Sequence, residues 1–238
     1  MQHNMKVEIW SDIMCPFCYI GKRKFENALQ QFPHKDQVEV IWHSYLLDPD
    51  LQQVPGKSIH EVLAEKKGCS TQQARQMNDQ VTAMAREVGL AYNLDQAVPA
   101  NTFAAHRLSH LAKKHGLQQE AEEGLFRAYF VEGKNIQDTD TLVQIGQESG
   151  LAEAEIRQVL AGDAFADEVQ RDLYEARQIG VRGVPFFVLN QKYAVSGAQP
   201  SEVFLQALNQ VWEEAHPQAL SGQADTASGP ACTDSDCA

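Results

Sequence analysis

Two cysteines, Cys15 and Cys18, lie where a short apolar segment meets an amphipathic one. Residues 6–10, with the sequence KVEIW, are typical of a β-strand that enters the turn. Residues 16–32 repeat apolar side chains at spacings of three and four, which predicts a helix, and Pro33 ends it. The two thiols are therefore predicted to lie at the N-terminus of a helix that follows a strand.

The rest of the chain returns to strand character only after a long helical block. Residues 38–47 are typical of a buried strand, so the cysteines fall inside a β-α-β unit. A hairpin is predicted from residues 183–190 and 193–197, followed by a last helix. Neither strand-containing end can close a core alone, so the two ends are predicted to share one sheet.

The expected fold class is α/β, a small domain interrupted by a large all-helical insertion. Two capping-box signals open helices in that insertion, the second at Ser70 and Gln73. The apolar stripe of this second helix is predicted to belong to the core: Met77, Val81, Met84 and Val88. Four segments are predicted: the first part of the α/β domain at 1–50, the insertion at 51–162, the second part at 163–214 and a tail at 215–238.

The charge and hydropathy of the chain argue against some classes of function. The net charge of -12 argues against a general partner for nucleic acid or an anionic membrane, since both are polyanions. The N-terminal residues show no apolar segment of a secretory signal, and no apolar run approaches the length of a membrane span. We therefore expect a cytoplasmic protein, in which paired thiols more often mean redox chemistry or metal binding than structural disulfides.

The spacing of Cys15 and Cys18 suits disulfide exchange. A helix N-terminus carries unpaired N–H groups and a partial positive charge, which favour an anion such as a thiolate. Cys15, expected at the first helical position ahead of Pro16, would be the exposed attacking sulfur, and Cys18, one turn further, the resolving one. The alternative is half of a zinc site, but zinc usually takes four ligands. We therefore predict a thioredoxin-like redox site with no metal and no cofactor.

A second element supports this interpretation. Thioredoxin-like sheets carry a cis-proline opposite the dithiol, and Pro185 stands after Val184 and before an apolar run, where that proline is expected. An ordinary trans-proline at the start of a strand is the alternative. With a cis bond, the backbone of Val184 would be free to pair with a bound peptide as an added strand.

The chain resembles the DsbA family of thiol–disulfide oxidoreductases, and within it the FrnE-like branch. Three segments carry the resemblance: SDIMCPFCYIGKRKFE at 11–26, NTFAAHRLSHLA at 101–112 and GVRGVPFFVLN at 180–190. It implies a thioredoxin domain with a helical insertion. It also implies exchange with protein or small-molecule thiols and disulfides, with glutathione or the thioredoxin system as candidates. Asn101, Thr102 and His106 would line a groove beside the dithiol, although His106 could equally be a capping or core histidine.

Two residues near the cysteines set an expectation for redox strength. The branch usually has Trp where this chain has Phe17, and periplasmic DsbA proteins have His. Phe17 offers neither a charge nor a hydrogen bond, so we predict an oxidant milder than DsbA, within a span of about -270 to -120 mV. Asp12, three residues before Cys15, would oppose a thiolate if it approached.

The remaining cysteines leave alternatives open. Cys232 and Cys237 could form a second dithiol, bind a soft metal or be two solvent thiols, while Cys69 is expected to be an incidental loop thiol. Two rival functions also stand. One is a glutathione-dependent isomerase or transferase of the kappa type, although those proteins have Ser in place of the first Cys. The other is a holdase or binding module in which the dithiol is a regulatory switch.

Overall fold

A four-stranded sheet forms the centre of the molecule, and it joins the two ends of the chain as predicted. The computed structural model describes residues 5–217. The strand order is β2-β1-β3-β4, with β1 parallel to β2 and antiparallel to β3. The strands are β1 Met5–Ser11, β2 Val38–Ser44, β3 Phe186–Leu189 and β4 Tyr193–Ser196.

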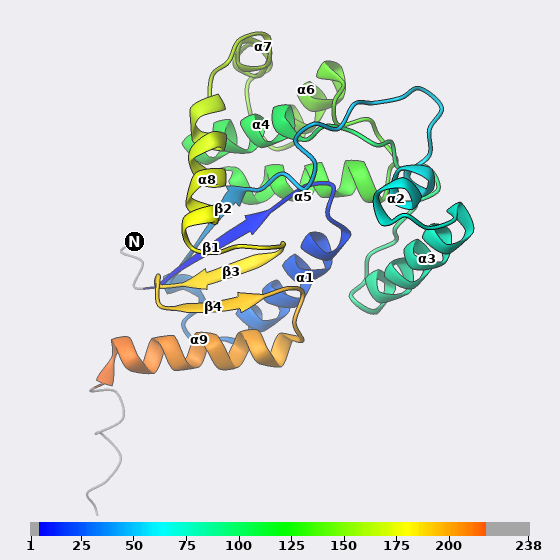
Figure 1. Ribbon diagram of the computed structural model, residues 1–238. Coiled ribbons are helices and arrows are strands. Elements are labelled where there is room, and N and C mark those ends of the chain that lie inside the picture. The colour runs from blue at the N-terminus through cyan, green and yellow to red at the C-terminus, as the bar shows by residue number, and fades with distance from the viewer. Residues whose placement is uncertain (1–4, 218–238) are drawn as a thin grey trace, which may run out of the picture.

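Helices cover both faces of this sheet (Figure 1). α1 and α9 pack together on one side, and α8 lies on the other side, where it contacts α4. The helices flanking the sheet are α1 Pro16–Gln31, α8 Ala166–Gln178 and α9 Ser201–Ala215, with a short 3₁₀ helix at Lys35–Gln37. The helical block contains α2 Ile59–Lys67, α3 Thr71–Glu87, α4 Phe103–Lys114, α5 Gln118–Phe130, α6 Thr139–Glu148 and α7 Glu153–Ala161. The predicted fold class, a thioredoxin-like fold with a helical insertion, is confirmed.

One hydrophobic core runs through the sheet and the insertion. Tyr19 of α1 stacks on Phe126 of α5 with ring centroids 5.0 Å apart, and Phe130 stacks on Tyr92 at 4.7 Å. All four side chains belong to the same buried cluster as the strands β1 and β3. The predicted boundaries at residues 50, 162 and 214 stay predictions, and this core joins the insertion to both parts of the sheet domain.

The insertion also covers one edge of the sheet. Gln118, the first residue of α5, accepts a hydrogen bond from the backbone N–H of Trp42 and donates one to its carbonyl, at 3.1 and 3.0 Å. Such side-chain partners satisfy the outer edge of β2, where an open strand would otherwise invite pairing with another chain. The end of β2 is thereby fixed to the helical block, next to the segment that approaches the dithiol turn.

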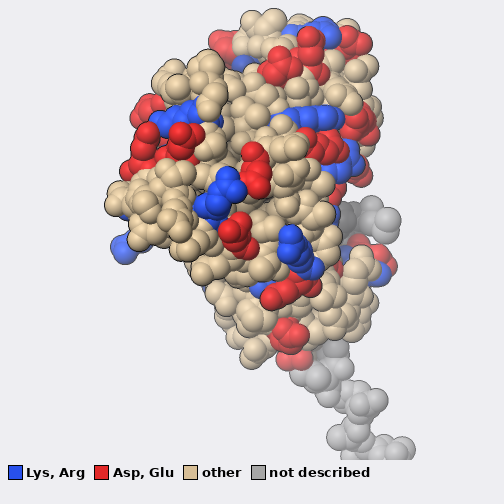
Figure 2. Space-filling view, turned by 90° about the vertical axis from the view of Figure 1, so that its right-hand side faces the viewer, with Lys and Arg blue, Asp and Glu red and all other residues tan. Residues whose placement is uncertain are grey.

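The two capping boxes form as predicted, but only half of the apolar stripe of α3 reaches the core: Val81 and Val88 are half-buried against it. Met77 and Met84 are 41 % and 37 % exposed. α3 packs mainly against α2, and its buried positions carry small or polar side chains: Ala74, Asn78 and Ala85. The prediction is wrong for Met77 and Met84, because the fully buried positions of the helix belong to the neighbouring stripe. Figure 2 views the side that carries α2 and α3, where acidic and basic residues are interspersed among wide uncharged areas.

Candidate active site at the dithiol turn

The turn between β1 and α1 carries both cysteines. Cys15 is the N-cap of α1 and Pro16 the first helical residue, so Cys15 lies one position earlier than predicted. Its side chain makes no capping hydrogen bond, and its backbone N–H donates to the carbonyl of Asp12 at 2.9 Å. The thiol is therefore not used by the helix and is available for chemistry at the helix N-terminus.

The two sulfurs differ in environment. Cys15 is 4 % exposed, and its thiol donates to the carbonyl oxygen of Val184 at 3.5 Å. Cys18 is fully buried, and burial raises the pKa of its thiol, with neighbouring Cys15 adding to the effect. Cys18 is the more buried sulfur, as expected. The expectation that Cys15 is open to solvent is wrong, because the loop that carries Val184 lies over it.

That loop contains the proline predicted to face the dithiol. The Val184–Pro185 peptide bond is cis. Within residues 5–217, the backbone N–H of Val184 donates to no acceptor. Pro185 is in close contact with α1 at Gly21, where a Cβ atom would lie 2.8 Å from Cγ of Pro185. Glycine at position 21 thus lets the helix that carries the dithiol approach the loop.

The two residues between the cysteines have different surroundings. Phe17 is 38 % exposed and places an aromatic ring at the surface beside the dithiol. The carbonyl of Pro16 accepts a hydrogen bond from the hydroxyl of Tyr92 at 2.7 Å. The insertion therefore holds the first turn of α1 directly.

Three residues expected to line a groove have other partners here. Asn101 donates to the carbonyl of Pro49 at 2.8 Å and its side-chain oxygen accepts from the N–H of Phe103. Thr102 and His106 are each 2 % exposed, and both lie against the carboxylate of Asp12. Burial of Thr102 and His106 does not fit direct contact with a substrate, and the structure brings them instead behind the dithiol turn.

The other cysteines lie away from this site. Cys69 is a half-buried thiol between α2 and α3. Cys232 and Cys237 fall outside the described residues, so their predicted pairing stays a prediction. The described part of the chain contains no helix long and apolar enough to cross a membrane.

Comparison with known proteins decides the family. The family described as "DSBA-like thioredoxin domain" matches residues 6–209. The chain belongs to that family. A crystal structure of a probable DsbA oxidoreductase from Streptomyces coelicolor is 45 % identical, with a TM-score of 0.82 over 88 % of this chain and 91 % of that one. The uncharacterized protein YwbO of Bacillus subtilis is 29 % identical over 85 % of this chain and 95 % of its own.

A more distant match extends the fold comparison. The cytosolic disulfide reductase DsbM from Pseudomonas aeruginosa, solved with GSH, has a TM-score of 0.60 at 16 % identity, covering 87 % of this chain and 99 % of that one. At this identity the match shows the fold alone. The family match and the Streptomyces structure thus place the chain in the DsbA-like family of thioredoxin-fold oxidoreductases.

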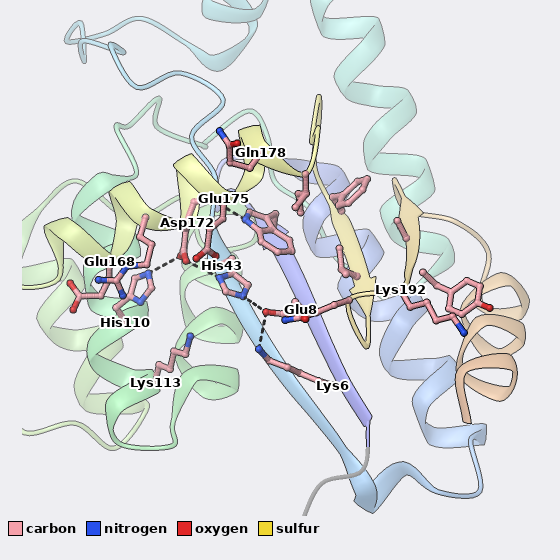
Figure 3. Close-up of a pocket in the computed structure, with 18 of the residues that line it drawn as sticks. Lys6, Glu8, His43, His110, Lys113, Glu168, Asp172, Glu175, Gln178 and Lys192 are labelled. Atoms are coloured by element: carbon pink, nitrogen blue, oxygen red, sulfur yellow. Dashed lines mark hydrogen bonds and ion pairs between the residues drawn. The ribbon is translucent and has the colours of Figure 1, made fainter. Parts of the chain in front are cut away.

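This DSBA-like domain also carries a polar cluster that sequence reasoning missed. A cavity of about 900 Å³ lies over the sheet face next to α8 (Figure 3). At its floor, Nδ1 of His43 lies 2.7 Å from Asp172, and Nε2 lies 3.2 Å from Glu8. Asp172 also accepts hydrogen bonds from Nε2 of His110 at 2.9 Å and from the N–H of Ser44 at 2.7 Å.

The partners of this cluster stabilise its charges. Burial alone would raise the pKa of Asp172, but hydrogen bonds from His110 and His43 outweigh it and hold that pKa well below its usual value. The hydrogen bond from His43 lowers the pKa of Glu8 to about 2. Burial alone would lower the pKa of His43, but Asp172 and Glu8 raise it. The ring also stacks on Trp10 at 4.4 Å.

His43, Asp172 and Glu175 could offer three ligand atoms to a metal ion, but both ring nitrogens of His43 already have carboxylate partners. The arrangement therefore fits an ion network that fastens β1, β2, α4 and α8 together. One signal in the sequence pointed to it. Glu8 and His43 are polar residues inside apolar strand segments, and buried polar groups need partners. The sequence does not show that Asp172, far along the chain, is the common partner.

Proposed function

We propose that this protein is a thiol–disulfide oxidoreductase of the FrnE-like branch, in which Cys15 is the attacking sulfur and Cys18 the resolving one. One observation carries the proposal. The thiol of Cys15 stands at the N-terminus of α1, 3.5 Å from the carbonyl of Val184, with Cys18 buried one turn behind. Pro16, Phe17 and Pro185 support this geometry.

Exchange proceeds in two steps that conserve atoms and electrons. The Cys15 thiolate attacks one sulfur of a substrate disulfide, so a mixed disulfide forms and one substrate thiolate leaves. Cys18 gives its proton to that thiolate and attacks the sulfur of Cys15, which releases the second substrate sulfur and forms the Cys15–Cys18 disulfide. Two electrons pass to the substrate. The same steps in reverse oxidise a substrate dithiol.

The deeper burial of Cys18 gives the two sulfurs different roles. The raised pKa of Cys18 keeps it protonated until the mixed disulfide has formed, so it does not compete with Cys15 for the substrate. The free N–H of Val184 offers a backbone hydrogen bond to a peptide that lies across the dithiol. Because the loop covers Cys15, a substrate must take the place of the contact between the Cys15 thiol and the Val184 carbonyl.

The partners we propose are protein thiols and disulfides together with a small thiol such as glutathione, which would return the protein to its dithiol form. DsbM, a protein of the same fold, is described as a cytosolic disulfide reductase and was solved with GSH. We propose the cytoplasm as the compartment. Cys232 and Cys237 remain candidates for a second redox pair that exchanges with the first.

Reduction of insulin by dithiothreitol tests this function. The wild-type protein is expected to accelerate the reaction. Cys15→Ser should abolish the acceleration, and Cys18→Ser should accumulate a mixed disulfide between Cys15 and a substrate thiol, visible by mass spectrometry. If Cys15→Ser or Cys15→Ala keeps the full effect on the substrate, the protein acts as a binding module and not through exchange.

A further inference from the structure

A buried carboxylate lies inside the turn that carries the dithiol. Asp12 is 0 % exposed. Its backbone carbonyl accepts the hydrogen bond from the N–H of Cys15 at 2.9 Å, so any movement of Asp12 is transmitted to Cys15. An isolated buried carboxylate is costly, and one persists only where donors surround it.

The donors come from three separate segments. Oδ2 of Asp12 accepts from the backbone N–H of Leu47 at 2.7 Å, and Oδ1 accepts from the hydroxyl of Thr102 at 2.7 Å. The N–H of Met14 lies 3.4 Å from Oδ1. Nε2 of His106 donates to the carbonyl of Tyr45 at 3.1 Å and lies 3.5 Å from Oδ1 of Asp12. The carboxylate thus fastens the dithiol turn to the end of β2 and to α4.

The use of Thr102 is unusual for its position. Thr102 is the N-cap of α4, where a threonine hydroxyl would ordinarily accept a hydrogen bond from the first turn of its own helix. No such bond forms, and the hydroxyl is directed at Asp12. Asn101 supplies the missing acceptor to the N–H of Phe103 at 2.9 Å. The start of the insertion is therefore arranged around Asp12.

We infer that Asp12 is a positioning residue for the dithiol, and that Thr102 at the start of the insertion holds it in place. This inference rests on the proposed function. Asp12 does not touch a substrate, because it is buried. Asp12 acts on Cys15 through the backbone of residues 12–15. Its carboxylate also places a negative charge behind the dithiol, where thiolates form.

Substitutions can separate the effect of the Asp12 charge from its effect on the position of Cys15. Asp12→Asn keeps the shape and removes the charge, so the thiolate of the reduced form is no longer opposed. The equilibrium constant for oxidation by glutathione disulfide is expected to fall about tenfold, which corresponds to about 30 mV towards a more oxidising protein. Thr102→Val keeps the charge and removes the donor. Its single-turnover rate with glutathione disulfide is expected to fall at least fivefold, with less than a threefold change in the equilibrium constant.

Two further variants serve as controls. Thr102→Ser restores the hydroxyl and should return the rate to within twofold of wild type. Asp172→Asn makes the same change in a buried carboxylate that lies away from the dithiol turn, and should leave both quantities within twofold of wild type under conditions where it is folded. If Asp12→Asn does not fold, the pair Thr102→Val and Thr102→Ser still tests the inference.

The inference is overturned if Asp12→Asn and Thr102→Val both match wild type in rate and equilibrium, or if Asp172→Asn changes them as much. Failure of the proposed function would look different. The glutathione equilibrium is a property of the dithiol itself, so it can be measured even if the protein proves inactive towards insulin.

Discussion

Two buried aspartates, Asp12 in the dithiol turn and Asp172 on α8, bind the C-terminal end of β2 or the residues just after it, and both contact α4, yet their roles differ. Asp12 accepts from the N–H of Leu47, and Asp172 accepts from the N–H of Ser44. α4 presents His106 towards the first and His110, one turn later, towards the second. Both carboxylates therefore help to fix the insertion against the sheet.

The difference lies in how fully each charge is neutralised. Asp172 has two imidazoles at 2.7 and 2.9 Å, whereas Asp12 has one imidazole at 3.5 Å and a neutral hydroxyl at 2.7 Å. When a carboxylate lies between two imidazoles, their charge cancels most of its electric field nearby, and its main effect is to hold the elements together. A carboxylate held mainly by neutral donors keeps its field, and the dithiol is what lies nearest along the chain. Of these two similar buried groups, Asp172 thus stabilises the packing of α8, and Asp12 adjusts the redox equilibrium of the dithiol.

The largest expected contrast is between Asp172→Asn and Cys15→Ser. Asp172→Asn leaves His43 and His110 without their shared charge and is expected to lower the free energy of unfolding by about 3 kcal/mol. Cys15→Ser should change it by less than about 1 kcal/mol and abolish exchange. Urea unfolding of both variants, beside insulin reduction, measures this. Equal losses of stability would remove the distinction between the two regions.

The same contrast should appear as a dependence on pH. The pKa of His43 is raised, so its stabilising contribution is complete below the unfolded value of about 6.5 and is lost as pH rises through the folded pKa. The pKa values of Asp172 and Glu8 are lowered, so their contribution is present above about 4 and is lost in acid. The stability difference between wild type and His43→Gln should therefore be largest near pH 5.5.

Between pH 5.5 and 9 we expect that difference to shrink, because His43 loses its proton and with it the attraction to Asp172 and Glu8. Lys113 also acts on His43 and opposes the raised pKa, and the carboxylate of Glu175 lies within 4.8 Å of the ring. Denaturant unfolding of wild type and variant at each pH gives the difference directly, and Asp138→Asn at an exposed helix cap is the control. A difference that stays constant over this range would show that His43 does not titrate there.

These two regions also mark what the sequence can and cannot reveal. The dithiol, the strand before it, the helix after it and Pro185 follow from local spacing, because each depends on residues close together in the chain. The partners of Asp12 and Asp172 come from segments tens of residues apart, and no local pattern pairs them. The burial of Cys15 was missed for the same reason, since Val184 covers it from a distant loop. The exposed Met77 shows that periodicity finds a stripe without saying which stripe is buried.

The contact between α1 and the loop of Pro185 gives a third comparison, of two glycines. Gly21→Ala would place Cβ 2.8 Å from Cγ of Pro185, whereas Gly162→Ala would meet nothing closer than 3.7 Å. The first should cost about 1–3 kcal/mol of stability by overpacking, and it should slow exchange severalfold because it displaces the loop whose Val184 N–H is proposed to bind the substrate. Unfolding and insulin reduction of both variants measure this. Matching behaviour of the two would show that the loop adjusts freely.

The smallest expected effect concerns the exposed residue between the cysteines. Phe17 offers no charge to the thiolate, while a histidine there would stabilise it and favour the dithiol form. Phe17→His should therefore lower the equilibrium constant for oxidation by glutathione disulfide up to tenfold, or about 30 mV, while Phe17→Leu, which changes only size and shape, should stay within twofold. Since the position is 38 % exposed, solvent screens the effect, and we expect it to be no larger than that of Asp12→Asn. A larger shift in Phe17→His would mean that the dipeptide, and not the buried carboxylate behind the turn, dominates the potential of this dithiol.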